Sequence, residues 1–435
     1  LGNKIWKQAL KIIPGGNMII SKRQEKFLPN FWPTYFSKAK GCNVWDLNGK
    51  KYFDLSLMGV GTNILGYGNK EVDKAVKLAI KMGNMSTLNC PEEVQLSKEL
   101  LKLHPWAGFV KYARSGGEAN TIALRIARAN SKKHNVAICG YHGWHDWYLA
   151  ANIKNNKNLK NHLSSKVDIS GVPIYLKNSI FTFKYNDFDG LKKIVSKNKI
   201  GIIKMEVSRD QFPSNNFLKK IRKFASKNKI ILIFDECTSG FRETFGGLHK
   251  KYNVKPDIAI FGKALGNGYA ITSVLAKKKY FKISKSLFIS STFWSERIGY
   301  VAAIATLKEM KKKKSWKKIS ITGRKIKKTW NFLAKKNKLK IDVKGLDALC
   351  SFQIKSNNFL KYKTYITQEM LKNGFLATNT IYVSTEHSNK ILNRYFKILD
   401  KIFYKIHLFE KKEMNINKNL DSGISEPGFR NNLKP

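Results

Sequence analysis

The stretch IILIFD, from Ile230 to Asp235, joins five consecutive apolar residues to an acid. An uninterrupted apolar run of this length is typical of a strand that is buried on both faces of a parallel sheet. A carboxyl group at the end of such a strand needs a partner, because an unpaired charge is costly to bury. Two interpretations stay open for Asp235: it holds a cationic group of a ligand, or it caps the helix that follows.

Three more apolar runs lie on either side of this stretch and have the same form. Each ends in polar or aromatic residues, and helical patterns separate them; the runs are Asn135–Cys139, Ile200–Lys204 and Asp257–Phe261. Short apolar strands that alternate with helices predict an α/β fold with a mostly parallel sheet. Ligands of such sheets bind at the carboxyl ends of the strands, so we expect the residues that follow the four runs to share one site.

A lysine follows the last of these runs in the segment FGKALGNG, residues 261–268. Lys263 and Asp235 are each delivered by the end of a buried strand, which is the pair that a pyridoxal phosphate (PLP) enzyme needs. The lysine amine forms a Schiff base with the cofactor aldehyde, and the acid keeps the pyridine nitrogen protonated. The alternative is one solvated lysine among many. The three glycines around Lys263 favour the first interpretation, because they indicate close backbone packing.

A turn that opens a helix supplies a candidate phosphate site. Ser115, Gly116 and Gly117 stand directly before residues with helical apolar spacing. Free amides and the positive end of the helix dipole make such a turn suitable for an anion. The same residues would also serve as an ordinary helix cap.

Aromatic and polar residues follow two of the other strands. Tyr141 could stack on a planar cofactor, or it could be a buried tyrosine with a satisfied hydroxyl. Its neighbour His142 and the acid Glu206 are further candidates for cofactor or substrate contact. His142, His145 and Asp146 are close in sequence, but no other ligand cluster accompanies them, so we predict no metal site.

The 435 residues carry a net charge of +51, which raises the possibility of a polyanion partner. The lysines are spread over every segment, however, and the densest run, Lys311–Lys314, falls where a helix end is expected. We therefore predict solvated helix faces and no specific nucleic-acid partner. No run approaches the roughly 18 apolar residues of a membrane span, and the first residues contain no secretory leader. Five scattered cysteines indicate reduced thiols and a cytoplasmic location.

The pattern along the chain predicts a large and a small domain. Residues 1–60 form an N-terminal segment that joins the small domain, with a helix through Ile13 and a hairpin over 43–54. Residues 61–315 form the large domain, including a helix over 91–103, and residues 316–410 form the α+β small domain. There we expect strands at 338–341 and 349–354 and a helix from about 386. The polar tail, residues 411–435, is expected to be loosely ordered.

Several segments together resemble the class III aminotransferases, which are fold-type I PLP enzymes; within that family the chain is most similar to glutamate-1-semialdehyde 2,1-aminomutase-like aminotransferases. The segments are SGGEAN at 115–120, YHG at 141–143, MEV at 205–207, FDECTSGFR at 234–242 and GKALGNG at 262–268. The resemblance implies a seven-stranded, mostly parallel sheet flanked by helices. It also implies PLP held by Lys263 and Asp235, with the phosphate on residues 115–117 and Tyr141 on the ring. Thr292 would reach the phosphate of a second subunit in a homodimer with shared active sites.

The departures from the family pattern concern the substrate. An arginine that grips the substrate carboxylate in the aminomutases is replaced by Lys22, with Arg23 one step later. The glutamate that pairs with it is replaced by Asn379, and an aromatic residue expected near Val60 is missing. Arg114 stands where relatives often have Asn. These four residues, Lys22, Arg23, Arg114 and Asn379, are the candidate substrate contacts. Because carboxylate recognition favours a bidentate guanidinium, the loss of the Arg–Glu pair argues against the aminomutase reaction.

The expected reaction is the transfer of an amino group from a small-molecule amino donor to a keto or aldehyde acceptor, with Lys263 moving the proton. An intramolecular aminomutase is the alternative, since both reactions use the same cofactor chemistry. Ammonia-lyase chemistry on the same fold and a non-catalytic, basic binding protein are the remaining alternatives. The residues do not identify the donor, the acceptor or the pathway.

Overall fold

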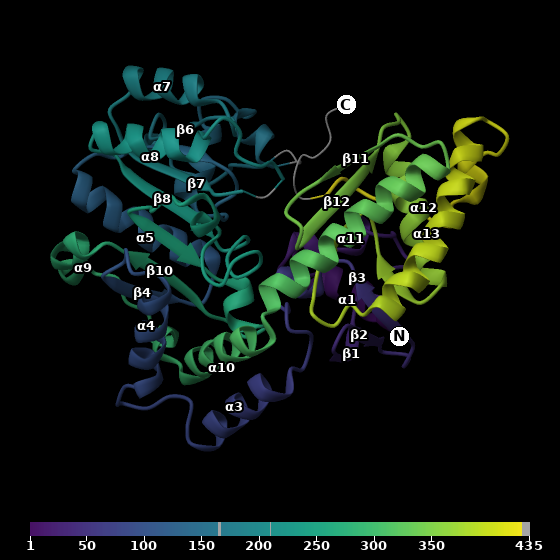
Figure 1. Ribbon diagram of the computed structural model, residues 1–435, viewed down its shortest axis with the longest axis horizontal. Coiled ribbons are helices and arrows are strands. Elements are labelled where there is room, and N and C mark those ends of the chain that lie inside the picture. The colour runs from purple at the N-terminus through teal and green to yellow at the C-terminus, as the bar shows by residue number, and fades with distance from the viewer. Residues whose placement is uncertain (164–166, 209, 429–435) are drawn as a thin grey trace. The chain divides into compact units, whose positions relative to one another are not determined.

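The computed structural model describes residues 1–163, 167–208 and 210–428 (Figure 1). Contacts within the chain divide it into two compact units. Unit 1 comprises Leu1–Asn69 and Lys317–Pro435, and unit 2 comprises Lys70–Trp316.

Unit 2 is built on a seven-stranded sheet. The strand order is β4-β10-β9-β8-β7-β5-β6; β5 to β9 pair in parallel, whereas β10 is antiparallel to both of its neighbours. The prediction of a mostly parallel sheet is therefore confirmed. The strands are β4 Phe109–Ala113, β5 Asn135–Cys139, β6 Ile180–Thr182, β7 Ile200–Glu206, β8 Ile231–Glu236, β9 Ile258–Phe261 and β10 Thr272–Ala276.

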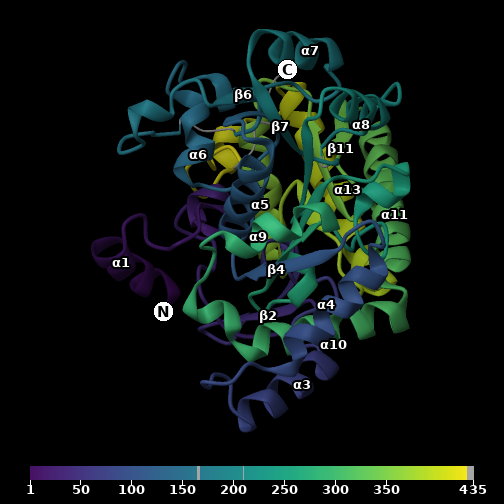
Figure 2. The same cartoon turned by 90° about the vertical axis from the view of Figure 1, so that its left-hand side faces the viewer.

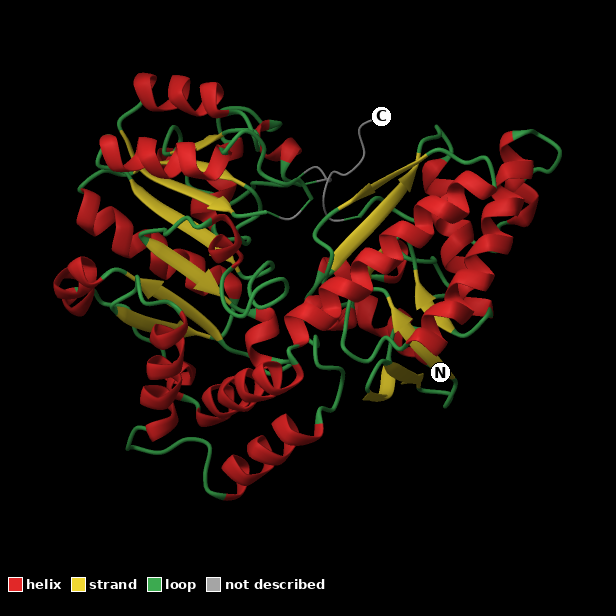
Figure 3. Cartoon of the chain, viewed as in Figure 1, coloured by secondary structure: helices red, strands yellow, loops and turns green. Residues whose placement is uncertain are grey.

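Helices flank this sheet (Figure 3). The long helix α5, Gly116–Ser131, packs across β4 and β7 to β10, while α7, Phe188–Lys197, and α8, Phe217–Lys227, contact β5, β8 and each other. Every residue of β7 and β8 is buried, which explains why these strands are mostly apolar in the sequence. The sheet can expose ligand-binding groups only where its strands end.

Three further helices gather at one end of unit 2 (Figure 2). They are α3 Lys70–Lys81, α4 Pro91–Leu103 and α10 Arg297–Lys313, and an ion pair of 2.7 Å between Arg297 and Glu92 joins α10 to α4. Lys311–Lys314 is the exposed end of α10, as predicted. Short helices complete the unit: α6 Asp146–Leu149, α9 Phe281–Ser286, η3 Ala150–Asn152, η4 Asn158–Asn161, η5 Ile174–Leu176, η6 Leu248–Tyr252, η7 Lys263–Gly266, η8 Lys278–Tyr280 and η9 Thr292–Ser295.

Unit 1 contains two smaller sheets. Their orders are β1-β2-β3-β13 and β11-β12-β14. The predicted hairpin is present, with its turn at Gly49 in the left-handed region (φ 79°). The strand expected at 338–341 begins at Ile341 instead, because Lys338 has a left-handed backbone (φ 56°) and belongs to the turn after α11. The strands are β1 Phe36–Lys40, β2 Asn43–Asp46, β3 Lys51–Leu55, β11 Ile341–Lys344, β12 Leu349–Ile354, β13 Phe375–Ala377 and β14 Thr380–Tyr382.

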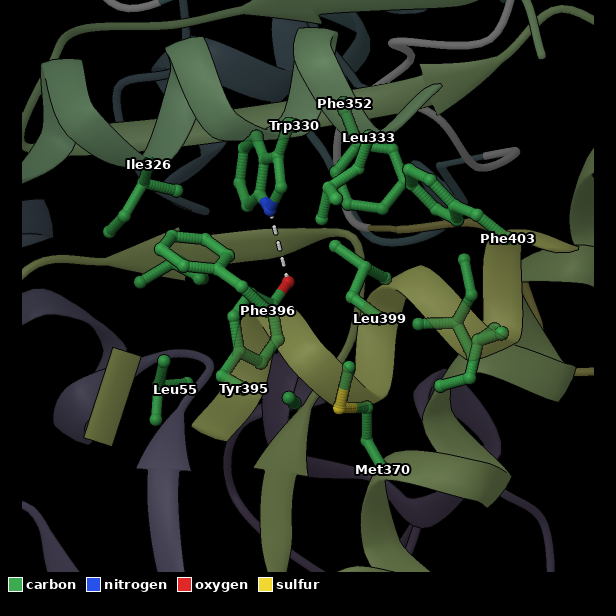
Figure 4. Close-up of a cluster of buried hydrophobic side chains, with 14 of the residues drawn as sticks. Leu55, Ile326, Trp330, Leu333, Phe352, Met370, Tyr395, Phe396, Leu399 and Phe403 are labelled. Atoms are coloured by element: carbon green, nitrogen blue, oxygen red, sulfur yellow. Dashed lines mark hydrogen bonds between the residues drawn. The ribbon is translucent and has the colours of Figure 1, made fainter. Parts of the chain in front are cut away.

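The core of unit 1 is a large cluster of aromatic and aliphatic side chains (Figure 4). Its one polar contact in the figure joins Trp330 Nε1, which donates, to Tyr395 Oη at 3.1 Å. This bond satisfies two polar atoms that would be costly to bury alone. The helices of the unit are α1 Gly2–Ile12, η1 Ile20–Lys22, η2 Gln24–Lys26, α2 Met58–Gly61, α11 Ser315–Lys336, α12 Phe359–Lys372, α13 Asn389–Glu410 and η10 Ile416–Asn419; α11 begins two residues before the unit does.

The tail after residue 411 is bound to the rest of unit 1 as far as residue 428, which corrects the expectation of loose order. Ser425 is buried, and its main-chain N–H donates to Thr364 Oγ1 at 2.9 Å. Lys363 donates to the carbonyl oxygens of Lys26 and Glu426 at 2.8 and 2.9 Å. Composition alone did not reveal these partners, because they come from segments distant in sequence. Residues 429–435 of the predicted tail lie outside the described residues.

A buried histidine makes the stability of unit 2 depend on pH. His104 Nε2 accepts from the N–H of Gly247 at 3.0 Å, and Nδ1 lies 2.9 Å from the Leu100 carbonyl oxygen, so the neutral ring fits this position. Burial, opposed by the bond to Leu100, lowers the pKa of His104 to about 4. The unfolded chain therefore binds the extra proton first, and the stabilisation present above about pH 6.5 is lost as the pH falls toward 4.

We expect this histidine to contribute about 2 kcal/mol less to the free energy of unfolding at pH 5 than at pH 7.5. Urea unfolding at the two pH values measures the difference. The His104→Gln variant should lose much of the acid sensitivity of unit 2, whereas His134→Gln, at an exposed position, should retain it. Equal acid sensitivity in both variants would contradict the assignment.

Candidate active site

Unit 2 contains most of the residues that the sequence singles out. Asp235 lies at the carboxyl end of β8, Glu206 at that of β7, and Lys263 directly after β9, while Tyr141 and His142 follow β5. These strands are neighbours in the order β9-β8-β7-β5 and run parallel, so their carboxyl ends meet at one edge of the sheet. That edge is where ligands of open α/β sheets bind.

Asp235 is a buried carboxylate with a hydrogen-bond partner on each oxygen. Its Oδ2 lies 2.9 Å from His142 Nδ1, and its Oδ1 accepts from the N–H of Cys237 at 3.1 Å. Burial acts to raise the pKa of Asp235, but His142 and the charge of Lys204 outweigh it and hold the pKa well below its usual range. Asp235 is therefore an anion with lone pairs left for a cationic ligand group.

His142 forms a buried hydrogen bond with Asp235, which the residues around it in the sequence do not indicate. It is 1% exposed, and burial lowers its pKa, so the ring is neutral and Nδ1–H donates to Asp235. The two residues are far apart in the chain, and only the pairing of β5 with β7 and β7 with β8 brings them together. His142 orients the carboxylate of Asp235.

Lys263 is held in an unusual backbone conformation. Its φ is 46°, in the left-handed region, which costs a non-glycine residue free energy and is concentrated at functional sites. Gly262 precedes it because a Cβ there would lie 2.9 Å from Thr272 Cγ2. The Lys263 amine donates to Thr238 Oγ1 at 2.8 Å. Thr238 is a site residue that sequence reasoning missed, although it stands three residues after Asp235 in the quoted FDECTSGFR segment.

The N-terminus of α5 offers two free amides. Ser115 and Glu118 form a capping box, in which Ser115 Oγ accepts from the Glu118 N–H and Glu118 Oε2 accepts from the Ser115 N–H at 2.8 Å. Among the described residues, nothing accepts from the main-chain N–H groups of Gly116 and Gly117. Unpaired amides at the start of a 16-residue helix form an anion site.

Tyr141 and Glu206 are connected through the backbone. The N–H of Tyr141 donates to Glu206 Oε2 at 3.2 Å, and the half-buried Tyr141 ring packs edge-on against Tyr148. Gly140, with φ 117°, allows this turn, because a Cβ there would lie 2.6 Å from Glu206 Oε2. Glu206 thus fixes the loop that presents the Tyr141 ring.

Arg114 holds the segment that contains Thr292. Its Nε donates to the Phe293 carbonyl oxygen at 2.9 Å, and its Nη2 donates to the carbonyl oxygens of Trp294 and Glu296 at 3.1 and 2.6 Å. The Glu296 carboxylate also lies 3.3 Å from Nε. These contacts support a structural use of the guanidinium, so the substrate role of Arg114 stays a prediction. Thr292 itself is exposed.

The remaining substrate candidates belong to unit 1. Lys22 is exposed, and the Arg23 guanidinium packs so closely on Gly15 that a Cβ there would lie 1.9 Å from Nη2. Asn379 donates from Nδ2 to the Phe352 carbonyl oxygen at 2.8 Å and accepts from Thr378 Oγ1 at 2.9 Å. Val60, where an aromatic residue was expected, has a left-handed φ of 60°. A substrate role for Lys22, Arg23 and Asn379 stays a prediction.

The other polar groups near the edge have local uses. His145 Nδ1 lies 2.9 Å from Thr121 Oγ1, beside the start of α5. Within residues 1–163, 167–208 and 210–428, no three His, Cys, Asp or Glu side chains gather as metal ligands. In the same residues, no helix combines the length and the apolar character needed to cross a membrane. The five cysteines, all described, form no disulfide.

Unit 2 thus contains a buried anion (Asp235), a lysine with a strained backbone (Lys263) and a helix start with two free amides (Gly116 and Gly117). This set fits PLP, whose pyridinium, aldehyde and phosphate need those three groups. Fold and donor set together define a PLP-dependent enzyme of the α/β class. The model of the family "aminotransferase class-III" matches residues 29–387, and the chain belongs to that family.

Relatives and solved structures agree with this assignment. The chain is 35% identical over 331 residues to a 3-aminobutyryl-CoA aminotransferase of Cloacimonas acidaminovorans, covering 74% of this chain and 75% of the relative. It is 29% identical to a glutamate-1-semialdehyde 2,1-aminomutase of Methanocaldococcus jannaschii, covering 92% and 97%. The fold is similar to that of the FumI protein of Sphingopyxis sp. MTA144, with a TM-score of 0.85, 20% identity and coverage of 96% and 99%.

Proposed function

We propose that the protein is an aminotransferase in which Lys263 binds the PLP aldehyde covalently and moves the proton, while Asp235 holds the pyridine nitrogen in its protonated form. When bound, PLP supplies an aldehyde that condenses with amines and a ring that withdraws electrons from the substrate carbon. The buried Asp235 carboxylate, anionic and fixed by His142, is the observation that carries the proposal.

Each remaining group has a defined task. The Gly116 and Gly117 amides would hold the phosphate, and the Tyr141 ring would lie on the cofactor face. Thr238 accepts from the Lys263 amine at 2.8 Å and would keep it oriented when it is not bound to the cofactor. In its neutral form, the Lys263 amine could accept a proton from the substrate carbon and return it elsewhere.

An intermolecular transfer is favoured over the aminomutase reaction. Carboxylate recognition by the aminomutase pattern depends on a cation and an acid, and Asn379 supplies no charge in place of the acid. Both relatives named above remain useful guides, because one name specifies a coenzyme A thioester of an amino acid and the other an amino aldehyde. The chain's positive charge is compatible with anionic substrates of either kind.

A spectroscopic half-reaction tests the proposal. Purified holoenzyme is mixed with single amino donors, including 3-aminobutyryl-CoA, and loss of the cofactor's visible band is followed. Recovery of the band with keto acids or aldehydes, and not without them, supports an aminotransferase. Turnover of glutamate-1-semialdehyde with no second substrate would establish the aminomutase instead. A protein with no visible band would be a non-catalytic relative, and release of ammonia would indicate a lyase.

The phosphate site gives a matched pair of glycine variants. A Cβ at Gly117 would lie 2.8 Å from His145 Cε1, whereas a Cβ at Gly116 would meet Cys237 Sγ at an ordinary 3.6 Å. We expect Gly117→Ala to disturb the helix start and weaken PLP binding by about 1–3 kcal/mol, the range for a lost buried hydrogen bond. Gly116→Ala should change the dissociation constant much less. Fluorescence titration of the apoenzymes with PLP measures both, and equal affinities would contradict the proposed phosphate site.

We further propose a homodimer in which Thr292 of one subunit reaches the phosphate of the other. Its exposure, together with the anchoring of its segment by Arg114, supports this role. Thr292→Ala should weaken PLP binding by about 1–3 kcal/mol without changing the mass in sedimentation, because a hydroxyl contact is lost and the subunit interface is not. Ser295→Ala, one turn later and also exposed, is the control. Wild-type affinity in Thr292→Ala would exclude the contact.

The cysteines and the two units support proposals about the protein's location and its domains. Five free cysteines support a reducing compartment, and we propose the cytoplasm. Unit 2, with the sheet and the PLP groups, would be the large domain, and unit 1 would be the small domain.

A further inference from the structure

Unit 2 contains a lysine in its interior that the proposed chemistry does not use. Lys204, on β7, is 0% exposed. Lysine is rarely buried without a partner, because removing the ammonium group from water is costly. Among the described residues, none forms a hydrogen bond with its Nζ. Its Nζ lies over the face of Trp147, 5.9 Å from the ring centre.

The register of the sheet places Lys204 near Asp235. Lys204 pairs with Ile233 and Glu206 pairs with Asp235, so Lys204 and Asp235 lie on the same face and one diagonal step apart. Diagonal neighbours on adjacent strands are separated by about 7–8 Å. A charge at that distance in a buried setting acts strongly on a carboxylate.

His142 completes a buried cluster. Its Nδ1 is bonded to Asp235, while its Nε2 is buried with no hydrogen-bond partner in the described part of the chain. The His142 ring lies 6.4 Å from the Trp147 ring, with 20° between the planes, so Trp147 packs on both His142 and Lys204. A lysine, a histidine and an aspartate are thus buried close to one another in unit 2.

The charges that face this cluster can be assigned. Asp235 lies on β8, the Cys237 thiol follows β8, and His142 lies in the segment after β5. Glu206 lies on β7 itself, and its carboxylate accepts from the N–H of Tyr141. Burial lowers the pKa of Lys204 to about 8, while Asp235 and Cys237 act in the opposite direction. Below pH 8 the amine is predominantly an ammonium ion, and its charge is opposed chiefly by Asp235.

We propose that Lys204 is a positioning residue that weakens the hold of Asp235 on the proton of the cofactor's pyridine nitrogen. A positive charge beside the carboxylate stabilises its anionic form and makes it a weaker base. The same charge disfavours a second cation at the pyridine nitrogen. Lys204 therefore limits how strongly the ring withdraws electrons. This inference rests on the proposed role of Asp235.

The test uses holoenzyme containing PLP labelled with nitrogen-15 in its ring. In Lys204→Met, which keeps an unbranched side chain one atom shorter and removes its charge, the nitrogen-15 shift should move toward the protonated form at pH 7. The midpoint of the visible-band pH titration should rise by about one pH unit. Lys204→Arg retains the charge and should titrate near the wild-type midpoint. If Lys204→Met does not fold, Lys204→Gln provides the neutral side chain.

Controls separate this role from packing and from failure of the Asp235 assignment. Lys363→Met removes a half-buried lysine of unit 1 whose amine donates to two main-chain carbonyl oxygens, and it should lower the melting temperature without changing either spectrum. If Lys204→Met changes only the melting temperature, Lys204 is a packing residue and the inference is wrong. If Asp235→Asn leaves the nitrogen-15 shift unchanged, the role of Asp235 itself is wrong, which is a separate result.

Discussion

Lys263→Ala should lose the covalent attachment of PLP and nearly all turnover. The amine is the only group of this side chain that can condense with the cofactor aldehyde, and its loss also removes the proposed proton carrier. Loss of general acid–base catalysis alone costs roughly 10²–10⁴-fold in rate, and the loss of the group that would hold the cofactor aldehyde adds to it. The measurements are single-turnover rates, and mass spectrometry of the protein after borohydride reduction, which should detect no PLP adduct on the variant.

Two controls make this result specific. Lys227→Ala removes an exposed lysine of α8 and should retain the adduct and wild-type turnover. Thr238→Val keeps the Lys263 amine but removes its hydrogen-bond acceptor, so the adduct should form while the rate falls. Wild-type turnover in Lys263→Ala would remove the proposed mechanism. A PLP adduct on a different lysine would show that the cofactor binds covalently to that lysine instead.

Asp235→Asn should lower the rate of proton abstraction from the substrate by about 10²–10³-fold, the range for removing one preorganised electrostatic contact from an enclosed site. A neutral amide cannot hold the pyridine nitrogen as a cation, so the ring withdraws fewer electrons. The Asn side chain can still accept from His142 Nδ1–H, and the fold should survive. Stopped-flow absorbance of the half-reaction gives the rate, and the visible band should still form, because Lys263 is intact.

Asp257→Asn is the matched control, since Asp257 is also a buried carboxylate of the same sheet. Its Oδ2 accepts from Arg222 at 2.7 Å and from the Leu232 N–H at 2.9 Å, and its Oδ1 accepts from Lys277 at 2.7 Å. It stands just before β9, at the opposite end from Lys263. The variant should lose stability through its unpaired cations and keep the half-reaction rate of the folded fraction. A similar rate loss in both variants would point to general damage to the sheet.

Much of the fold could be predicted because local pattern and burial agree. The runs that became β5, β7, β8 and β9 are mostly apolar, as is typical of strands covered on both faces. The helix of residues 91–103 was predicted with both of its ends, since Pro91 occupies a first-turn position that suits proline. The strand expected at 338–341 was displaced because a left-handed turn residue, Lys338, carries no signal that distinguishes it from other lysines.

Contacts between distant segments could not be predicted in the same way. The tail residue Ser425 docks on Thr364, and nothing in the polar composition of the tail indicates that partner. Arg114 was a candidate for the substrate, but its guanidinium meets the carbonyl oxygens of residues 293, 294 and 296. An arginine has the same appearance in a sequence whether its donors face a ligand or a main chain.

The amino-acid sequence by itself indicated four strands of the large sheet, and that a lysine and an acid stand close to the ends of two of them. Periodicity and apolar runs indicate these features because each residue's polarity reflects whether that residue is buried. Only the tertiary structure decided that His142 orients Asp235, that Thr238 holds Lys263, and that Lys204 is buried on the same face of the sheet as Asp235. Those facts depend on which strands are neighbours and on their register, and both are set by packing between segments that the chain keeps far apart.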